Sequence, residues 1–444
     1  MCAPKSQRIL LVTLLAVLAC AAIAANLGQD DQQVSFTGPA GSTATDAVSP
    51  AVAFDSINQR YQLVWSADEV DGEFRVMGQF LSGAAGQPLG PAFPLGTAPS
   101  GSDQRQPAVA YASIHEHFLV VWSGDELNQG AYEIMGRLVM ADGTLDGPVR
   151  RFSEMGSNDA DPSFDAVTPY LDYALTQDAF TLVWAADDDT GLLQDGRFEV
   201  YGQLIDGANG TEFGANDFRI TYSLSDDQKN DVLEPAVAVQ PGTDRWFVAF
   251  EGDIADDEIH APEIWVYGCT SDVPDGSAFP VSNMGGSPFD GLSARHPDLV
   301  WVPSSSEFVC VWDGQDGSTK SPAIFGQRFA PDGTLAGGMI NFSTGAGTPY
   351  GDLREATHPS ITIDPVTDDW FVAWRGDLDD GTEHHDHEIW ARRFDDVGNP
   401  VDAAAFTLSD MDPSLGPVGR MAAEAVGQGL VETGLVRVVA PTGT

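Results

Sequence analysis

An apolar run that ends in an aromatic residue recurs six times along this chain of 444 residues, and this repeat limits what the chain can fold into. The aromatic residues follow one another after 57, 62, 66, 62 and 62 residues. These anchor residues are Trp65, Trp122, Trp184, Phe250, Trp312 and Trp374. A fixed period of this length is typical of repeat architectures, in which each unit buries its apolar faces against its neighbours. We therefore interpret the chain as an array of one repeated unit.

Each repeat contains four short segments with the composition of β-strands. The first follows a proline in five units, the second is the run that ends in the anchor, the third usually carries a glycine, and the fourth is short. Asp-Gly-Thr at 142–144 and at 332–334 is a hairpin signal between the third and fourth segments. Because no stretch of ten residues keeps a helical period, we expect an all-β fold.

Four antiparallel strands per unit predict a β-propeller, because blades arranged in a ring leave few open sheet edges. The anchors are then expected in the core between neighbouring blades. The remaining residues 26–44 and 411–444 can pair into a seventh, incomplete blade, so we favour seven blades, with six as the alternative. The repeats are expected at about 45–98, 99–155, 156–224, 225–285, 286–346 and 347–410.

Residues 1–25 have the form of a secretory signal peptide, with a positive start, an apolar stretch and a small-residue cleavage site at 22–24. The apolar stretch is too short to span a membrane, and no later segment reaches the length of a span. We therefore expect a secreted protein, extracellular or periplasmic, in which residues 26–444 form a single propeller domain. The alternative is a lipid anchor at Cys20, since residues 17–20 loosely resemble a lipobox.

The composition is strongly acidic, with 66 acidic against 21 basic residues and a net charge of −45. A surface of this charge repels nucleic acid and anionic lipid, so we expect no nucleic-acid partner. It suits a saline medium, and it also attracts divalent cations.

The unit resembles the propeller repeats of large secreted bacterial proteins and the blades of TolB-type propellers. The resemblance rests on Leu-Val-Val-Trp, Glu-Ile-x-Gly-Arg and Asp-Gly-Thr, as at 119–122, 133–137 and 142–144, and it covers residues 45–410. It implies the fold but no single function, because such families include adhesion, scaffold and surface modules as well as enzymes. No segment matches a TolB-type N-terminal domain, so the partners of that family are not implied.

Carboxylates recur between the second and third segments of the units. An aspartate follows the anchor by three residues in five units, and further acids and glycines come after it. Such carboxylates can wrap a Ca²⁺ ion with oxygen ligands, whereas an aspartate directly after a strand can instead cap a turn by accepting backbone N–H groups. The Ca²⁺ ligands that this pattern predicts are Asp68, Asp71, Asp187, Asp189, Asp253, Asp256, Asp377 and Asp379.

Histidines offer a second kind of candidate site. His385 and His387 lie in a stretch rich in histidine and acids, where an extended backbone places them on one face. They supply two ligands for a transition metal, or they belong to a solvated loop. His296 and His358 each precede a proline at the start of a first strand, and we expect both as loop residues near one face of the ring.

Beyond residues 1–25 the chain has only two cysteines, Cys269 and Cys310. Two cysteines in so long a chain do not form a disulfide scaffold, so the core has to stabilise the fold. They either form one disulfide across neighbouring blades or remain two thiols.

Motifs of known enzymes are missing from the sequence, which has no Gly-x-Ser-x-Gly, no phosphate-binding loop, no His-Glu-x-x-His and no Cys-x-x-Cys. We therefore expect a non-enzymatic secreted propeller that binds a protein or a glycan through long acidic loops. The alternative is an extracellular hydrolase or lyase at the mouth of the channel, and a third interpretation is a structural matrix component. An enzyme requires several inward-pointing polar residues at that mouth, whereas a scaffold is expected to have a small or apolar channel.

Overall fold

The structure is a computed structural model that describes Ser35 and residues 46–409 with several gaps. The gaps are 71, 84–85, 98, 158–160, 189–195, 223–231, 253–261, 286–291, 316–321, 344–355, 378–386 and 403. Within the described ranges, the chain forms no helix with the length and apolar content that crossing a bilayer requires.

The described residues form six sheets of four antiparallel strands each, and the strands of every sheet follow chain order. Blades 1 and 2 consist of β1 (Ala47–Asp55), β2 (Arg60–Val70), β3 (Glu73–Ser82), β4 (Phe93–Pro94), β5 (Gln104–Ala112), β6 (His117–Gly124), β7 (Glu133–Met140) and β8 (Leu145–Arg151). Blades 3 and 4 consist of β9 (Ala166–Ala174), β10 (Ala179–Ala186), β11 (Glu199–Asp206), β12 (Glu212–Arg219), β13 (Val232–Val239), β14 (Arg245–Gly252), β15 (Glu263–Thr270) and β16 (Val273–Pro280). Blades 5 and 6 consist of β17 (Ala294–Val302), β18 (Glu307–Gly314), β19 (Ala323–Phe329), β20 (Leu335–Asn341), β21 (Ala356–Ile363), β22 (Trp370–Asp377), β23 (His387–Phe394) and β24 (Phe406–Thr407).

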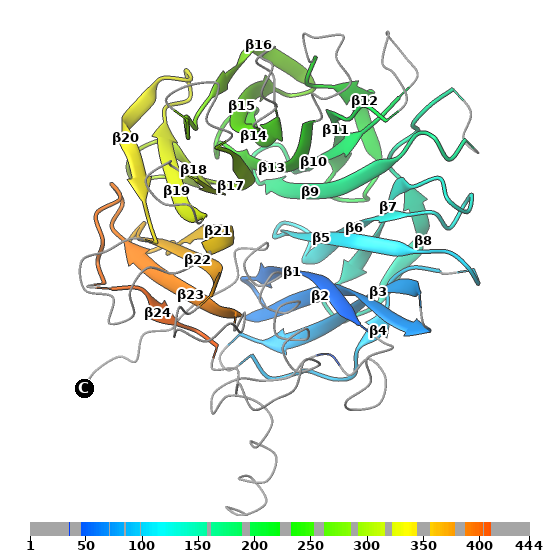
Figure 1. Cartoon of the computed structure of the whole chain (residues 1–444). Helices are drawn as coiled ribbons and strands as arrows, with labels where there is room; N and C mark the ends of the chain where they lie inside the picture. Colours follow the sequence, from blue (N-terminus) through cyan, green and yellow to red (C-terminus); the bar gives the residue numbers. More distant parts are fainter. Residues whose placement is uncertain are drawn as a thin grey trace, which may run out of the picture.

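The sheets lie around a central axis as the blades of a propeller, which confirms the predicted fold class (Figure 1). The first strand of each blade is innermost, and β1, β5, β9, β13, β17 and β21 surround the channel. Neighbouring first strands from β1 to β21 contact one another along the chain. The described residues thus form six blades rather than the favoured seven, and nearly all of the segments expected to build a seventh lie outside them.

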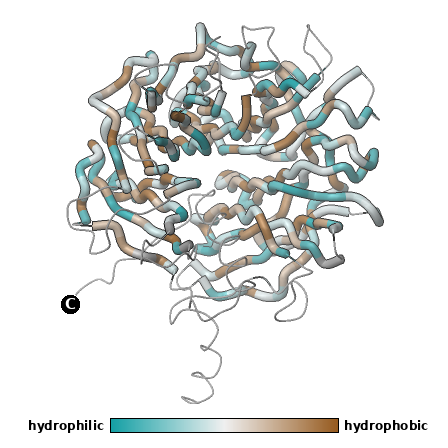
Figure 2. The backbone as a smooth tube through the Cα atoms, viewed as in Figure 1, coloured by the Kyte–Doolittle hydropathy of each residue, from teal (hydrophilic) through white to brown (hydrophobic). Residues whose placement is uncertain are grey.

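The anchors are core residues, and five of the six lie between neighbouring blades as predicted. Among the described residues, Trp65 packs instead in a cluster of blade 1 alone. All six lie on second strands and are 0–4% exposed. Apolar clusters join blade 1 to 2, 2 to 3, 3 to 4, 4 to 5 and 5 to 6, so each of these interfaces is a small hydrophobic core. Hydrophobic residues accordingly recur along the strands all around the ring (Figure 2). Burying one such large side chain contributes about 1.5–3 kcal/mol.

A glycine on the third strand is required where an aromatic ring from the end of the fourth strand packs. A Cβ added at Gly326 would lie 2.6 Å from the ring of Phe342 and 2.7 Å from the carbonyl oxygen of Cys310. Gly136 has the same surroundings, with Phe152 and the carbonyl oxygen of Val120 at 2.6 and 2.7 Å. In these two blades the glycine therefore makes room for the ring that closes the interface.

A glutamate at the start of the third strand also recurs, and it holds the end of the fourth. Glu133 accepts a hydrogen bond from the Ser153 hydroxyl, and that hydroxyl accepts the N–H of Ile134 at 2.7 Å. Equivalent pairs are Glu199 with Thr221, Glu263 with Ser282 and Glu388 with Ser409. The repeat thus preserves a buried hydrogen-bond pair as well as an apolar pattern.

The two cysteines are separate and buried. Cys269 lies on β15 in the core between blades 3 and 4, and Cys310 lies on β18 in the core between blades 4 and 5. Of the two alternatives, the structure therefore has two thiols.

We predict that Gly326→Ala lowers the free energy of unfolding by about 1–3 kcal/mol, because the added methyl group overpacks the contact with Phe342. Gly338→Ala on the same blade is the matched control, since an added Cβ there meets nothing within 4 Å. Urea unfolding of both variants measures the difference. Equal stability of the two would contradict the packing role of the glycine.

We predict that stability falls as the pH rises from about 4.5 to about 7. Burial raises the pKa of Glu133 from 4.5 to about 7, so over this range the folded protein holds a proton that the unfolded chain releases. Glu133→Gln removes this titration and makes the pH dependence shallower than in the wild type. Thermal unfolding across the range measures it, with Glu116→Gln, an exposed residue of the same blade, as the control.

Candidate functional site at the channel mouth

Every first strand contains the same backbone irregularity at its channel end. The residue before a proline has a positive φ of 48–52°, and the pairing with the second strand skips at this point in all six blades. These bulge residues are Ser49, Gln106, Thr168, Glu234, His296 and His358. A non-glycine residue at such a φ is uncommon, and a β-bulge tolerates proline and redirects a side chain.

This geometry corrects three sequence expectations. The prolines do not begin the first strands, because β1, β5, β13, β17 and β21 begin three residues earlier. His296 and His358 are strand residues within β17 and β21 rather than loop residues. A sixth member of the pattern, Thr168-Pro169 on β9, is not recognised from the sequence, although its spacing from the anchor Trp184 matches that of the other units.

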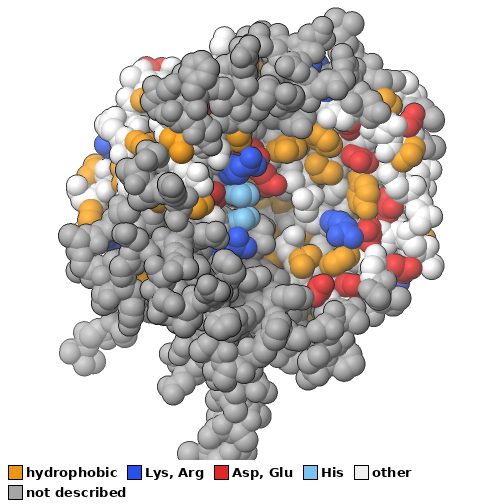
Figure 3. All heavy atoms as spheres, in the orientation of Figure 1, with side chains coloured by type: hydrophobic (Ala, Val, Ile, Leu, Met, Phe, Trp, Pro, Cys, Tyr) orange, Lys and Arg blue, Asp and Glu red, His pale blue; other side chains and the backbone are white. Residues whose placement is uncertain are grey.

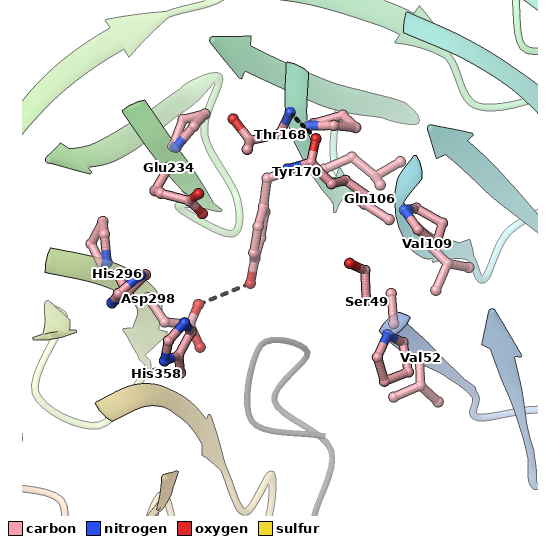
Figure 4. Close-up of a pocket in the computed structure, with 18 of the residues that line it drawn as sticks. Ser49, Val52, Gln106, Val109, Thr168, Tyr170, Glu234, His296, Asp298 and His358 are labelled. Atoms are coloured by element: carbon pink, nitrogen blue, oxygen red, sulfur yellow. Dashed lines mark hydrogen bonds between the residues drawn. The ribbon is translucent and has the colours of Figure 1, made fainter. Parts of the chain in front are cut away.

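The six bulge residues and the residues that follow them line a pocket of about 320 Å³. Figure 4 shows their side chains arranged around it, and Figure 3 shows histidine side chains beside the hollow at the centre of the ring. This volume lies at the lower end of the range of small-molecule sites. The pocket is therefore the mouth of the propeller channel.

The lining is chemically asymmetric. Blades 1 to 3 contribute neutral residues at the bulge, whereas blades 4 to 6 contribute Glu234, His296 and His358. The residue after each anchor follows the same division, because Ser66, Ser123 and Ala185 are replaced in blades 4 to 6 by Glu251, Asp313 and Arg375. Groups that can move protons or bind a cation are thus concentrated on one side of the mouth.

Asp313 on β18 joins the two histidines. One of its carboxylate oxygens lies 2.7 Å from Nδ1 of His296 and accepts the backbone N–H of His358 at 2.9 Å. The two imidazole rings are stacked, with centroids 3.8 Å apart and planes at 23°. Sequence reasoning missed Asp313 in this role because the contact with His358 comes from the next blade.

Acidic groups surround this histidine pair. Burial lowers the pKa of His296, but the hydrogen bond to Asp313 and the charges of Asp313, Glu234 and Glu251 outweigh it, so the pKa lies above its ordinary value. Burial raises the pKa of Glu234 and of Glu251, and the negative charge of Asp313 adds to both. Glu251 also accepts the N–H of His296 at 3.3 Å and lies 3.5 Å from Arg295.

A buried carboxylate in the lining of the mouth connects three blades. Asp298 of blade 5 accepts hydrogen bonds from the hydroxyl of Tyr170 in blade 3 and that of Ser360 in blade 6, both at 2.9 Å. It also accepts the N–H groups of Leu299 and Ile361. Each of its oxygens therefore has two partners, and we assign Asp298 a structural role.

The donor atoms of His296, Asp313 and His358 all lie within 4.8 Å of one another, so this part of the described chain could hold a metal ion. The residues predicted to bind Ca²⁺ are not part of this group. Asp68 accepts the N–H of Gly72 at 3.0 Å, and Asp187 accepts those of Asp165 and Gly196 at 2.6 and 2.9 Å. These contacts are those of the turn-capping alternative.

The remaining predicted ligands cannot be placed. Asp71, Asp189, Asp253, Asp256, Asp379 and the side chain of Asp377 lie outside the described residues. The same holds for His385 and the side chain of His387. The loop Ca²⁺ sites therefore stay a prediction.

Comparison with known proteins identifies the fold and no family. No family model and no curated protein sequence matches the chain.

A solved protein of unknown function from Dyadobacter fermentans DSM 18053 is 11% identical, with a TM-score of 0.50, and the alignment covers 76% of this chain and 92% of that one. Trypanosoma rangeli sialidase in complex with the inhibitor DANA is 10% identical with a TM-score of 0.48, covering 80% and 57%. A thermostable family-43 glycoside hydrolase is 14% identical with a TM-score of 0.41, covering 86% and 99%. At these identities the likeness concerns the fold alone.

The expectation of a non-enzymatic binding scaffold is wrong. The channel mouth collects inward-pointing polar side chains from all six blades, which is the arrangement that the hydrolase alternative requires. The sialidase and the family-43 glycoside hydrolase compared above are not TolB-like proteins. The repeated-blade propeller is the part of the sequence resemblance that the structure confirms.

We predict that Asp298→Ala lowers the free energy of unfolding by about 2–4 kcal/mol, because it leaves two buried hydroxyl and two N–H groups without their acceptor. Tyr170→Phe removes one donor and leaves the other three in place, so a loss of about 1 kcal/mol is expected. Chemical unfolding of the two variants checks this order. A larger loss for Tyr170→Phe would contradict the structural role of Asp298.

Proposed function

We propose that the protein is a hydrolase whose active site is the channel mouth, and that it acts on a neutral substrate rich in hydroxyl groups, such as a carbohydrate. The observation that supports this most directly is the imidazole of His296. It is hydrogen-bonded through Nδ1 to Asp313 and borders the pocket beside Glu234 (Figure 4).

The pair of His296 and Asp313 suits the activation of a water molecule. A carboxylate at Nδ1 fixes the orientation and tautomer of an imidazole, and it leaves Nε2 as the atom that accepts a proton. In this protein the proton comes from the attacking water. Asp313 is held in turn by the N–H of His358, so the base is positioned by two neighbouring blades.

Glu234 is the candidate proton donor to the leaving group. It occupies the bulge of blade 4, next to His296 of blade 5 on the ring of first strands. Hydrolysis requires a base for the water and an acid for the departing oxygen, and the two groups lie on adjacent strands. Glu251 acts as a positioning residue, because it accepts the backbone N–H of His296.

The opposite side of the mouth suits a hydroxyl-rich substrate. Ser49, Gln106 and Thr168 offer uncharged donors and acceptors, and the prolines that follow them, with Tyr170, offer apolar surface. The net charge of −45 disfavours a polyanion. This substrate class rests on the lining itself, because the glycan-processing enzymes among the solved propellers share only the fold.

The signal-like residues 1–25 agree with an extracellular polymer as substrate, and we keep export as part of the proposal. Ca²⁺ in the acidic loops would stabilise the rim and is a separate prediction. The resemblance to TolB-type repeats adds no activity.

We predict that the wild-type protein releases reducing ends from one or more members of a panel of neutral polysaccharides, and that His296→Asn and Asp313→Asn lower kcat/KM by about 100-fold or more. The matched control is His115→Asn, which alters a histidine of blade 2 outside the pocket. Activity that survives His296→Asn would contradict the assigned base. Wild-type protein inactive on the whole panel would overturn the substrate class.

A further inference from the structure

We propose that His296, His358 and Asp313 bind one divalent transition-metal ion of the Zn²⁺ type at the channel mouth. The inference rests on the site of the proposed function, and an ion there would supply the activation of water that the pair of His296 and Asp313 supplies without it. Three features carry it: the identity of the donor atoms, their convergence, and the open space in front of them.

The donor set is two imidazole nitrogens and one carboxylate oxygen, drawn from three strands of two adjacent blades. All three donor atoms lie within 4.8 Å of one another, a separation that modest rotation of the side chains reduces to the spacing of ligands on one ion. Asp313 is buried and the histidines are partly buried, so the cluster is half shielded from solvent. Three protein ligands with a fourth position open are the usual arrangement of catalytic zinc.

The bulge in the backbone orients the two histidines, and the residue types distinguish blades 5 and 6 from the other blades. The same bulge occurs in all six blades, so the bulge by itself indicates no metal. Only blades 5 and 6 carry histidine at this position, and only blade 5 carries aspartate after its anchor. The backbone N–H of His358 donates to Asp313 and that of His296 to Glu251, so both rings are positioned by the preceding blade.

Imidazole ligands favour a transition metal over Ca²⁺. Calcium prefers six to eight oxygen ligands, whereas two nitrogens and one carboxylate suit Zn²⁺ or its neighbours in the first row. Asp313 in the cluster and Glu251 beside it are the carboxylates that compensate the charge of a divalent ion. The site is therefore distinct from the Ca²⁺ sites predicted in the loops.

Metal binding replaces the contact between His296 and Asp313. In the structure the two groups share a hydrogen bond of 2.7 Å, and an ion would take the place of that hydrogen. A water molecule bound at the open position would then face the pocket, where Glu234 lies. A bound Zn²⁺ ion supplies a polarised water at neutral pH.

The test uses the full-length protein, stripped with chelator and dialysed. Calorimetric titration with Zn²⁺ is expected to show one tight site per chain, and titration with Co²⁺ to give the visible absorption of a four-coordinate ion. His296→Ala and His358→Ala are each expected to weaken Zn²⁺ binding by about 100-fold or more. Asp313→Asn, which retains an acceptor for the N–H of His358, is the conservative variant and is also expected to weaken it.

Two controls keep the result decisive. His115→Ala changes a histidine outside the cluster and should bind Zn²⁺ as the wild type does. The double variant His385→Ala/His387→Ala removes the other histidine-rich stretch and should also retain the site. Loss of binding in that double variant, with retention in folded His296→Ala, would overturn the proposal, as would the absence of a tight site in the wild type.

Binding is measured without substrate, so its outcome is separate from that of the proposed function. Zn²⁺ binding by a protein that hydrolyses no polysaccharide would support the metal site and count against the hydrolase. Hydrolysis by a protein that binds no Zn²⁺ would support the histidine–aspartate base alone and reject the metal.

Discussion

Burial of the apolar faces of each sheet against the next is the interaction on which this structure depends. A four-stranded blade has two faces to cover, and the anchors Trp122, Trp184 and Trp312 are fully buried where neighbouring blades meet. Covering sheet faces with neighbouring blades in this way arranges the blades around one axis, and the described residues show five such interfaces, from blade 1 to blade 6. The ring in turn brings six equivalent strand ends to one point, so the pocket is a geometric consequence of the packing that stabilises the fold.

The pocket combines a repeated backbone with side chains that are not repeated. The bulge before each proline has nearly the same φ in all blades, from Ser49 to His358. Yet the residues that it presents change from neutral to titratable halfway around the ring. The fold thus determines where these side chains point, and the local sequence of each blade determines the chemistry. Asp313 shows this dependence well, because its partners come from its own first strand and from that of the next blade.

The sequence predicted the fold better than the site, for physical reasons. Anchor spacing and strand alternation are properties of the repeat, so six sheets with buried second strands could be deduced from residues such as Trp65 and Trp374. The bulges could not be deduced from the sequence, because a proline is compatible with the first position of a strand as well as with a bulge. The sequence places His296 and His358 before first-strand prolines, but their stacking arises only when blades 5 and 6 lie side by side. The abundance of aspartate favours Ca²⁺ sites in the loops, whereas Asp187 accepts backbone N–H groups in the structure.

The six bulge positions are equivalent in backbone geometry and carry side chains of different chemistry. Each position has its own proline and the strand pairing of its own blade, and the preceding blade accepts the bulge N–H of Thr168, His296 and His358. Asp298 joins blades 3, 5 and 6 through residues outside the bulge positions. An exchange at Ser49, in the neutral half of the ring, would therefore alter what the mouth recognises without changing the groups that contact His296. Such a design lets selection, or an engineer, vary the ligand preference of the protein blade by blade while the reactive half stays constant.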